Sequence, residues 1–263
     1  MERSTYEKFR KLVYDQSGIC LGANKEALVS ARIGKRMRAL GLSDHGQYLR
    51  FVVEDNTGEE LIKLIDAIST NVTSFFRESV HFDFLQEVFS GWLEEGQHRF
   101  RFWSAASSTG EEPYSMAMTL REAMNGHKAD VRILATDIST RALEQCHRAT
   151  YRADKLNTVP KPLLHKYFNR TQDGDFRVAQ SLKDMLLFRR MNLMTPPFPM
   201  RGPLDVVFCR NVMIYFDNPV RRKLLTEIYR LLKPGGYLMV GHTETLVGID
   251  STFTSVRPAI YVK

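Results

Sequence analysis

Apolar residues are spaced in two different ways along the chain, and the change falls near residue 80. Before it they recur at helical intervals, as in Tyr6, Phe9 and Val13, and again in Leu61 and Leu64. From about residue 98 onward, short apolar runs that suit buried strands alternate with helical patterns, which is typical of a parallel sheet covered by helices. We therefore predict an all-α N-terminal domain over residues 1–80 and an α/β domain over residues 81–263.

The α/β part contains five apolar runs that we predict to be strands. They cover residues 99–105, 131–136, 186–191, 204–209 and 236–241. A helix over Arg222–Leu232 is expected to stop at Lys233-Pro-Gly-Gly236, because proline and glycine end helices. The tail, Phe253–Lys263, is expected to add short strands that break near Pro258.

Residues 150–186 interrupt this alternation, because they are too many for a simple connection between a helix and a strand. Within them, Asp173-Gly174 stands between two short apolar runs and is typical of a β-hairpin turn. We predict a small inserted β subdomain. This subdomain either contacts a partner or is an insertion without a function of its own.

Net charge, cysteine spacing and the length of apolar runs indicate the cellular compartment and the kind of partner to expect. The net charge of +7 predicts an acidic partner, whether nucleic acid, an anionic membrane or an acidic protein surface. The three cysteines lie far apart without metal-ligand spacing, so we expect reduced thiols in a cytoplasmic protein and no metal centre. No apolar run approaches the roughly 18 residues of a membrane span, so direct membrane insertion is not expected.

One helical stretch, residues 31–40, carries four cations and no acid: Arg32, Lys35, Arg36 and Arg38. Arg32 and Arg36 are four residues apart, so they share one face of a helix with Lys35 beside them. This basic helix is either a solvated face or a docking surface for an acidic partner.

The segment Phe102–Met116 is predicted to form a buried strand, a turn of small residues and the start of a helix. Glu111 and Glu112 open that helix, where two carboxylates would repel a phosphate but attract a cation. S-adenosylmethionine carries a sulfonium and an ammonium, and therefore suits this turn. The alternative is an ordinary junction between a strand and a helix, capped by serine and threonine.

Polar residues follow three more of the predicted strands. Asp137 stands at the tip of the second strand, where this topology holds ribose hydroxyls, although an aspartate there could equally cap the next helix. Asn192-Leu193 and Arg210-Asn211 follow two later strands, at the edge where open α/β sheets bind ligands. Simple turn formation is the alternative for both asparagines.

Four blocks of the sequence resemble one known family in the same order along the chain. They are Asn71-Val-Thr-Ser-Phe-Phe-Arg-Glu78, Trp103-Ser-Ala-Ala-Ser-Ser-Thr-Gly-Glu-Glu-Pro-Tyr-Ser115, Ala135-Thr-Asp-Ile-Ser139 and Phe208-Cys-Arg-Asn-Val-Met-Ile-Tyr-Phe216. These blocks are similar to the CheR family of bacterial chemotaxis receptor methyltransferases. The resemblance implies a class I S-adenosylmethionine-dependent methyltransferase domain of Rossmann-like fold, with a helical N-terminal domain and a β insertion.

The resemblance also implies a reaction, a product and a place in the cell. The family methylates glutamate side chains on the cytoplasmic helices of chemoreceptors, and S-adenosylmethionine becomes S-adenosylhomocysteine. A cytoplasmic enzyme recruited to membrane-bound receptor arrays is therefore expected. The hairpin turn Thr171–Asp175 is short, whereas relatives that grip a C-terminal receptor peptide have a longer loop, so we expect independence of that peptide.

Residue roles are carried over from the family by motif. The residues implied to bind the cofactor are Asn71, Thr73, Arg77, Glu111, Glu112, Asp137, Asn192, Leu193, Arg210 and Asn211. Arg77 also faces the acceptor, and Tyr215 is implied to lie near the transferred methyl group. Which of the paired glutamates makes direct contact stays open.

The sequence argues against two other functions. A nucleic-acid methyltransferase would carry an Asp/Asn-Pro-Pro-Tyr motif after the fourth strand, but the chain has Cys-Arg-Asn-Val-Met-Ile-Tyr there. A non-catalytic sensor of S-adenosylmethionine would not need Arg77 and Tyr215, and both are present. Methyl transfer to a carboxylate, which is ionised at neutral pH, needs positioning and no general base.

Overall fold

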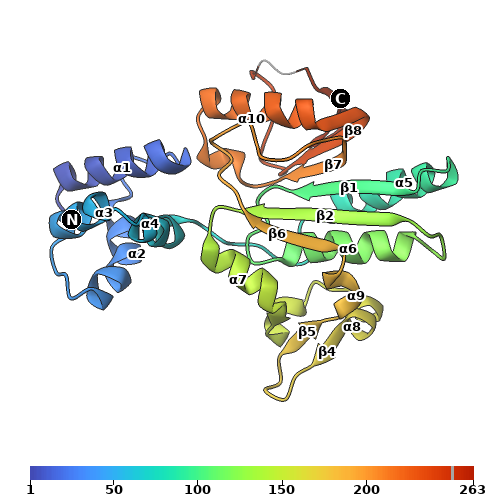
Figure 1. The fold of residues 1–263 in the computed structure, drawn as a ribbon, viewed down its shortest axis with the longest axis horizontal. Helices are drawn as coiled ribbons and strands as arrows, with labels where there is room; N and C mark the ends of the chain where they lie inside the picture. Colours follow the sequence, from blue (N-terminus) through green and yellow to red (C-terminus); the bar gives the residue numbers. More distant parts are fainter. Residues whose placement is uncertain (250–251) are drawn as a thin grey trace.

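The first region of the computed structural model, which describes residues 1–249 and 252–263, is a bundle of four short helices set to one side of a sheet (Figure 1). The helices are α1 (Arg3–Ser17), α2 (Glu26–Ala39), α3 (His45–Glu54) and α4 (Glu59–Ile68). Their buried apolar residues, among them Tyr6, Phe9 and Leu64, form a core of their own. The helical spacing of the sequence predicted this bundle, and the prediction is confirmed.

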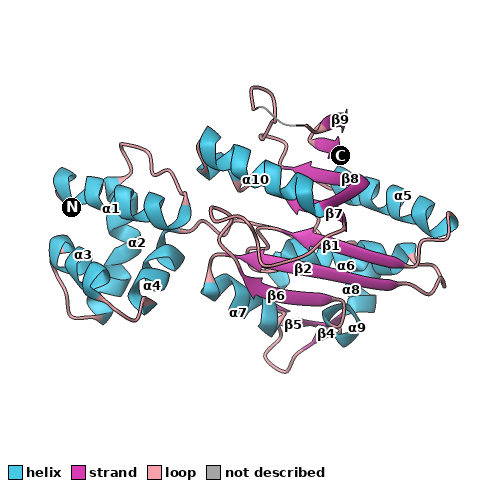
Figure 2. Ribbon diagram, turned by 45° about the horizontal axis from the view of Figure 1, so that its top comes forward, coloured by secondary structure: helices cyan, strands magenta, loops and turns pink. Residues whose placement is uncertain are grey.

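A seven-stranded sheet forms the second region (Figure 2). Its strands are β1 (Arg99–Ser104), β2 (Asp130–Asp137), β6 (Leu186–Arg190), β7 (Leu204–Cys209), β8 (Leu232–Val240), β9 (Thr254–Arg257) and β10 (Ile260–Val262). The order is β6-β2-β1-β7-β8-β10-β9. The first five strands in this order pair in parallel, while β10 runs antiparallel to both of its neighbours. The predicted broken strands of the tail are β9 and β10.

Helices cover both faces of this sheet because alternate residues of a strand point to opposite faces. Phe102 of β1 and Phe208 of β7 join a core with α5 (Val80–Glu94), α6 (Glu111–Ala123) and α7 (Thr140–Arg148). Trp103 and Val207, the adjacent residues, join a second core beneath α10 (Asn218–Leu231). This mostly parallel sheet, covered by helices on both faces, is the predicted α/β architecture.

The end of α10 differs from the prediction. The helix ends at Leu231 and β8 begins at Leu232, so the Lys233–Gly236 turn lies within the strand instead of separating it from the helix. Leu204 of β7 pairs with Leu232 of β8, but Val206 pairs with Tyr237. The extra residues of β8 between these two pairs form a bulge. Lys233 pairs with Asp205 at 2.7 Å, and this contact ties the bulge to β7.

The inserted β subdomain is present between α7 and β6. Its three short antiparallel strands are ordered β3 (Thr150–Tyr151), β5 (Phe176–Val178), β4 (Phe168–Arg170), and α8 (Lys161–Tyr167) and α9 (Gln180–Lys183) flank them. The predicted hairpin closes where the Thr171 amide donates to the Asp175 carbonyl at 2.8 Å. Gly174 has a φ of +84°, which explains the glycine at this turn.

Within residues 1–249 and 252–263, no helix is long and apolar enough to cross a bilayer.

Candidate active site

A cavity of about 350 Å³ opens at the carboxyl ends of β1, β2, β6 and β7. Both parts of the chain line it: the loop after α1 and the segment after α4 lie opposite the ends of the strands. Ten of the eleven site residues expected from the sequence lie on its wall, namely Asn71, Thr73, Arg77, Glu112, Asp137, Asn192, Leu193, Arg210, Asn211 and Tyr215. The exception is Glu111.

The turn after β1 explains why the two glutamates differ. Gly110 precedes α6 with a φ of +102°, and an added Cβ would lie 2.5 Å from the Tyr151 hydroxyl. No side chain caps α6, so the serine and threonine capping alternative does not describe this junction. Glu112 faces the cavity, whereas Glu111 lies outside it and accepts a hydrogen bond from Thr109 Oγ1 at 2.6 Å. Of the two glutamates, only Glu112 is therefore placed to contact a molecule in the cavity.

Asp137 fixes the shape of this turn from the tip of β2. Its Oδ2 accepts the Ser108 amide at 2.8 Å and its Oδ1 accepts the Ser139 amide at 2.9 Å. The capping residue of α7 is Ser139, whose side chain accepts the Ala142 amide, so the capping alternative for Asp137 is wrong. Burial raises the pKa of Asp137, and the two backbone amides oppose that shift.

A buried arginine holds Glu112 in place. Arg210 Nη1 donates to Glu112 Oε2 at 3.0 Å, and Nη2 donates to Glu78 Oε2 at 3.0 Å and to the Arg77 carbonyl. Ser104 donates to the other oxygen of Glu112 at 2.8 Å. Burial raises the pKa of Glu112, and the Arg210 guanidinium opposes this rise. Arg210 thus lies on the cavity wall and also fixes the position of Glu112, and the sequence did not indicate the second role.

Arg77 lies on a segment whose backbone is held in an unusual conformation. The residues on either side, Phe76 and Glu78, have φ values of +52° and +57°, which non-glycine residues seldom adopt. The Phe76 amide donates to Ser115 Oγ at 3.0 Å, and the neighbouring Phe75 is fully buried. The hydrogen bond to α6 and the burial of Phe75 hold the backbone of this segment in place, and Arg77 extends from it to the cavity.

Glu244 supports the opposite wall, where Asn211 and Tyr215 lie. Its buried carboxylate accepts the amides of Gly241 and Asn211, both at 2.7 Å, and of Ile214 at 3.2 Å. Asn211 has a φ of +55°, so its backbone needs such an anchor. Sequence reasoning missed Glu244 because it follows β8, away from every motif that pointed to the site.

The helical region closes over the cavity through specific hydrogen bonds. The Cys20 amide donates to the Tyr215 carbonyl at 2.8 Å, and Asn192 Nδ2 donates to the Gln16 carbonyl at the same distance. The loop after α1 therefore lies against the residue expected beside the transferred methyl group. The sequence carried no signal for this contact, since the two segments are far apart along the chain.

The basic helix is only partly available to a partner. Arg36 forms a two-point ion pair with buried Glu60, at 2.7 and 2.6 Å, and Arg32 donates to the Ile68 carbonyl and to Thr70. Arg32 and Arg36 therefore tie α2 to the end of α4, and contact of the basic helix with a partner stays a prediction. Lys35 and Arg38 are exposed.

Comparison with known proteins gives the family. The family model described as "CheR methyltransferase, SAM binding domain" matches residues 71–262, and "CheR methyltransferase, all-alpha domain" matches residues 4–69. The chain belongs to the CheR methyltransferase family. The chemotaxis protein methyltransferase of Borreliella burgdorferi is 40% identical over 260 residues, 96% of this chain and 92% of that protein. That of Escherichia coli is 36% identical over 259 residues, 97% of this chain and 89% of that protein.

The family match confirms a class I S-adenosylmethionine-dependent methyltransferase domain behind an all-α domain, and this CheR chain offers a fitting cavity. Its volume lies within the range of roughly 300–1,000 Å³ that is common for small-molecule sites. The acids that line it are Glu112 and Asp137, which suit an ammonium group and ribose hydroxyls respectively. The apolar Ile138 and Leu193 complete a wall that suits a base.

Proposed function

We propose that this CheR methyltransferase transfers the methyl group of S-adenosylmethionine to glutamate side chains on the cytoplasmic helices of chemoreceptors. The arrangement of charge at the cavity carries the proposal. Lys25, Arg32 and Arg77 line it and would attract an acceptor carboxylate. Among the described residues of its wall there is no histidine, and both acids are already engaged by hydrogen bonds.

Each part of the wall has a distinct task in this proposal. S-adenosylmethionine supplies an electrophilic methyl group next to a sulfonium. Glu112 and Asp137 bind and orient the cofactor, and Arg77 aligns the acceptor carboxylate without taking a proton from it. Tyr215 packs beside the line of transfer, while the loop after α1 covers it and limits the access of water.

A labelling experiment tests the proposed reaction. Purified protein is incubated with S-adenosylmethionine tritiated at the methyl group and with receptor-containing membranes, and the labelled receptor is then treated with alkali. A glutamate methyl ester releases volatile radioactive methanol under these conditions. Label that resists alkali, or label that enters nucleic acid instead of the receptor, would reject the proposal.

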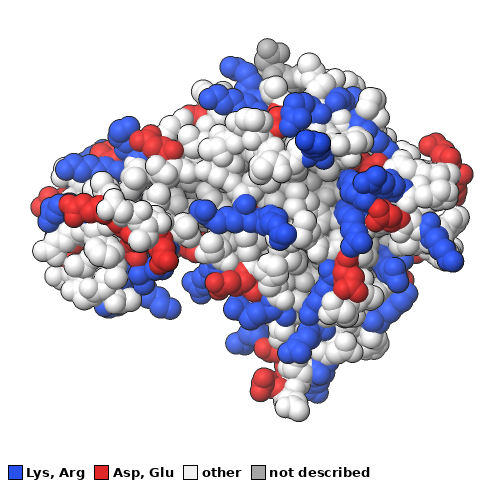
Figure 3. All heavy atoms as spheres, in the orientation of Figure 1, with Lys and Arg blue, Asp and Glu red and all other residues white. Residues whose placement is uncertain are grey.

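The acceptor surface is proposed to be recognised partly through α2. Figure 3 shows groups of Lys and Arg side chains scattered over the face in view, with Asp and Glu among them on the helical region, and the net charge of +7 agrees with a glutamate-rich partner. Because Arg32 and Arg36 are used within the fold, docking by this helix falls to Lys35 and Arg38.

Reversing the charge of Lys35 and Arg38 to glutamate is expected to raise the apparent KM for receptor by about 2- to 30-fold at low salt. This range follows from two exposed ion pairs worth about 0.2–1 kcal/mol each, and added salt should reduce the effect. Cofactor affinity should not change. The matched control reverses Arg3 and Lys8 on α1, which gives the same change in net charge. An equal rise of KM in the control would show that net charge, not α2, is responsible.

Recruitment through a receptor's C-terminal peptide is proposed to be unnecessary, since the hairpin loop between Thr171 and Asp175 is short. Deleting the terminal residues of the receptor should leave the methylation rate nearly unchanged. The measurement compares initial rates on intact and shortened receptor at equal concentration. Micromolar binding of the free terminal peptide to the protein would contradict this expectation.

A further inference from the structure

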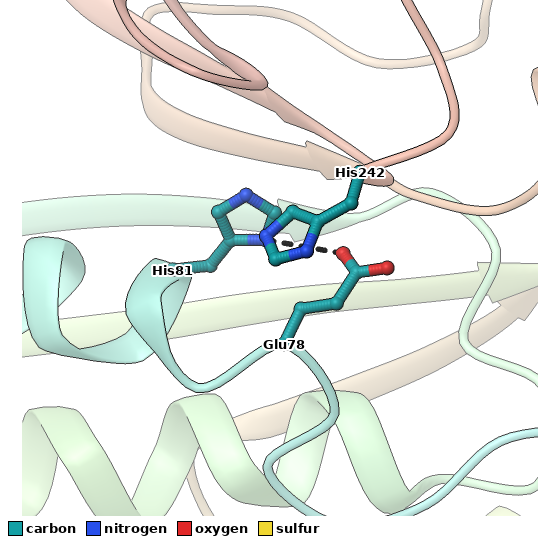
Figure 4. Close-up of side chains that lie close together, drawn as sticks. All are labelled: Glu78, His81 and His242. Atoms are coloured by element: carbon teal, nitrogen blue, oxygen red, sulfur yellow. Dashed lines mark ion pairs between the residues drawn. The ribbon is translucent and has the colours of Figure 1, made fainter.

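Three potential metal ligands meet beside the Arg210 cluster (Figure 4). Glu78 lies just before α5, His81 lies in the first turn of that helix, and His242 follows the end of β8. One ligand atom from each residue lies within 4.8 Å of those of the other two. The His81 Nδ1 atom is 3.5 Å from Glu78 Oε2, and the two imidazole rings are 5.1 Å apart between centroids.

His81 is the informative member of this group. It is fully buried, and neither of its ring nitrogens has a hydrogen-bond partner in the described part of the chain. A buried polar group that has no partner destabilises the fold. Its ring packs in a T-shaped arrangement against the rings of both Phe208 and His242. Of these two nitrogens, Nδ1 lies on the side of Glu78, so an ion held between Glu78 and His242 would give this nitrogen a partner.

We propose that Glu78, His81 and His242 bind a divalent transition-metal ion, with Zn²⁺ as the reference ion. Two imidazoles and one carboxylate are a common zinc ligand set, and a site with three protein ligands leaves one position for water. His242 is exposed, so this position and the route of entry face the solvent. Figure 4 shows both rings and the carboxylate converging from two separate segments.

The geometry needs only a small adjustment to accept the ion. Zinc lies ~2.1 Å from its ligands, so ligand atoms of a tetrahedral site are ~3.4 Å apart. The 3.5 Å between Glu78 and His81 already meets this requirement. The His242 side chain would have to move closer to the other two ligands, and it is free to do so because it is exposed.

Arg210, which pairs with Glu78, is expected to weaken the binding of the metal ion. Glu78 Oε2 also accepts a hydrogen bond from Arg210 at 3.0 Å, so the ion would share this carboxylate with a guanidinium. The Glu112 carboxylate, on the other side of Arg210, offsets part of that positive charge. We therefore expect micromolar binding, weaker than at a closed structural zinc site.

The test is calorimetric titration of ZnCl₂ into chelator-treated protein that carries no affinity tag. One equivalent should bind to the native sequence, and His242→Ala should weaken binding at least 10-fold, since one of three ligands is lost. His165→Ala is the matched control, because it removes an exposed histidine far from the group and should leave binding unchanged. Co²⁺ in place of Zn²⁺ should give the absorption of a tetrahedral site in the native protein and lose it in His242→Ala.

Several results would overturn the proposal. Failure of the native protein to take up zinc is one, and equal affinity of native and His242→Ala proteins is another. The exposed thiol of Cys20 provides a competing location. Zinc that is retained by His242→Ala and lost from Cys20→Ser would place the ion at that thiol.

Discussion

Arg77→Ala is expected to lower turnover by about 100-fold, because the acceptor carboxylate loses the group that aligns it for in-line attack. The side chain donates one hydrogen bond, to the Val72 carbonyl at 3.0 Å, and takes no part in an ion pair among the described residues. The fold should therefore tolerate the change. The measurement is kcat with saturating S-adenosylmethionine and receptor, together with the melting temperature of the variant.

Two companion variants make the Arg77 result specific. Arg99→Ala removes an exposed arginine at the start of β1, on the edge of the sheet away from the cavity, and should keep full turnover. Arg77→Lys keeps the charge but not the planar two-point donor, so it should fall between alanine and the native residue. Native-like turnover in Arg77→Ala would remove this residue from the acceptor site.

Glu112→Gln is expected to weaken S-adenosylmethionine binding by about 1.5–3 kcal/mol, or roughly 10- to 150-fold in Kd, the range for a hydrogen bond to a charged group. The amide keeps the size of the side chain and can still accept from Ser104, but it loses the negative charge that faces a bound ammonium. Calorimetric titration with S-adenosylmethionine measures the effect.

The adjacent residue provides an unusually close control for this prediction. Glu111 is also buried and in the same first turn of α6, but it lies outside the cavity. Glu111→Gln should therefore leave cofactor affinity unchanged. An equal loss of affinity in both variants would show that the glutamates act through the turn before α6, and an effect of Glu111→Gln alone would reverse their assignment.

The architecture was predictable from the sequence because it follows from hydrophobic spacing. Periods of three to four residues predicted the bundle, and short apolar runs predicted the strands of the parallel sheet. The bulge of β8 was not predictable in this way. Lys233–Gly236 has the composition of a helix stop, and only the pairing of Lys233 with Asp205 shows how a strand accommodates it.

Site residues that come directly after a strand could be predicted from the sequence. Contacts that depend on the pairing of distant side chains could not. Asp137 and Asn211 stand directly after strands, so topology brings them to one edge. The ion pair of Arg36 with Glu60 joins two helices, and local spacing gave no reason to expect it. The sequence could not show which of Glu111 and Glu112 faces the cavity, because this depends on how the first turn of α6 is oriented.

The proposed metal site also depends on residues that are far apart in the sequence. The separated cysteines led us to expect no metal centre. His81 and His242 belong to segments at opposite ends of the α/β part and meet only when α5 packs beside the end of β8. A search for closely spaced ligands could not have found this pair.

We expect the acceptor carboxylate to arrive already ionised, so that the enzyme removes no proton from it. The pH dependence of turnover distinguishes this mechanism from general-base catalysis. With a glutamate acceptor of intrinsic pKa near 4.3, the rate should rise as that group ionises and then stay flat from about pH 6 to 9. Tyr215→Phe should keep this flat profile, because ring packing survives the loss of the hydroxyl. A steep rise between about pH 7 and 9 that disappears in Tyr215→Phe would show that the tyrosine acts as a general base, and would contradict the account.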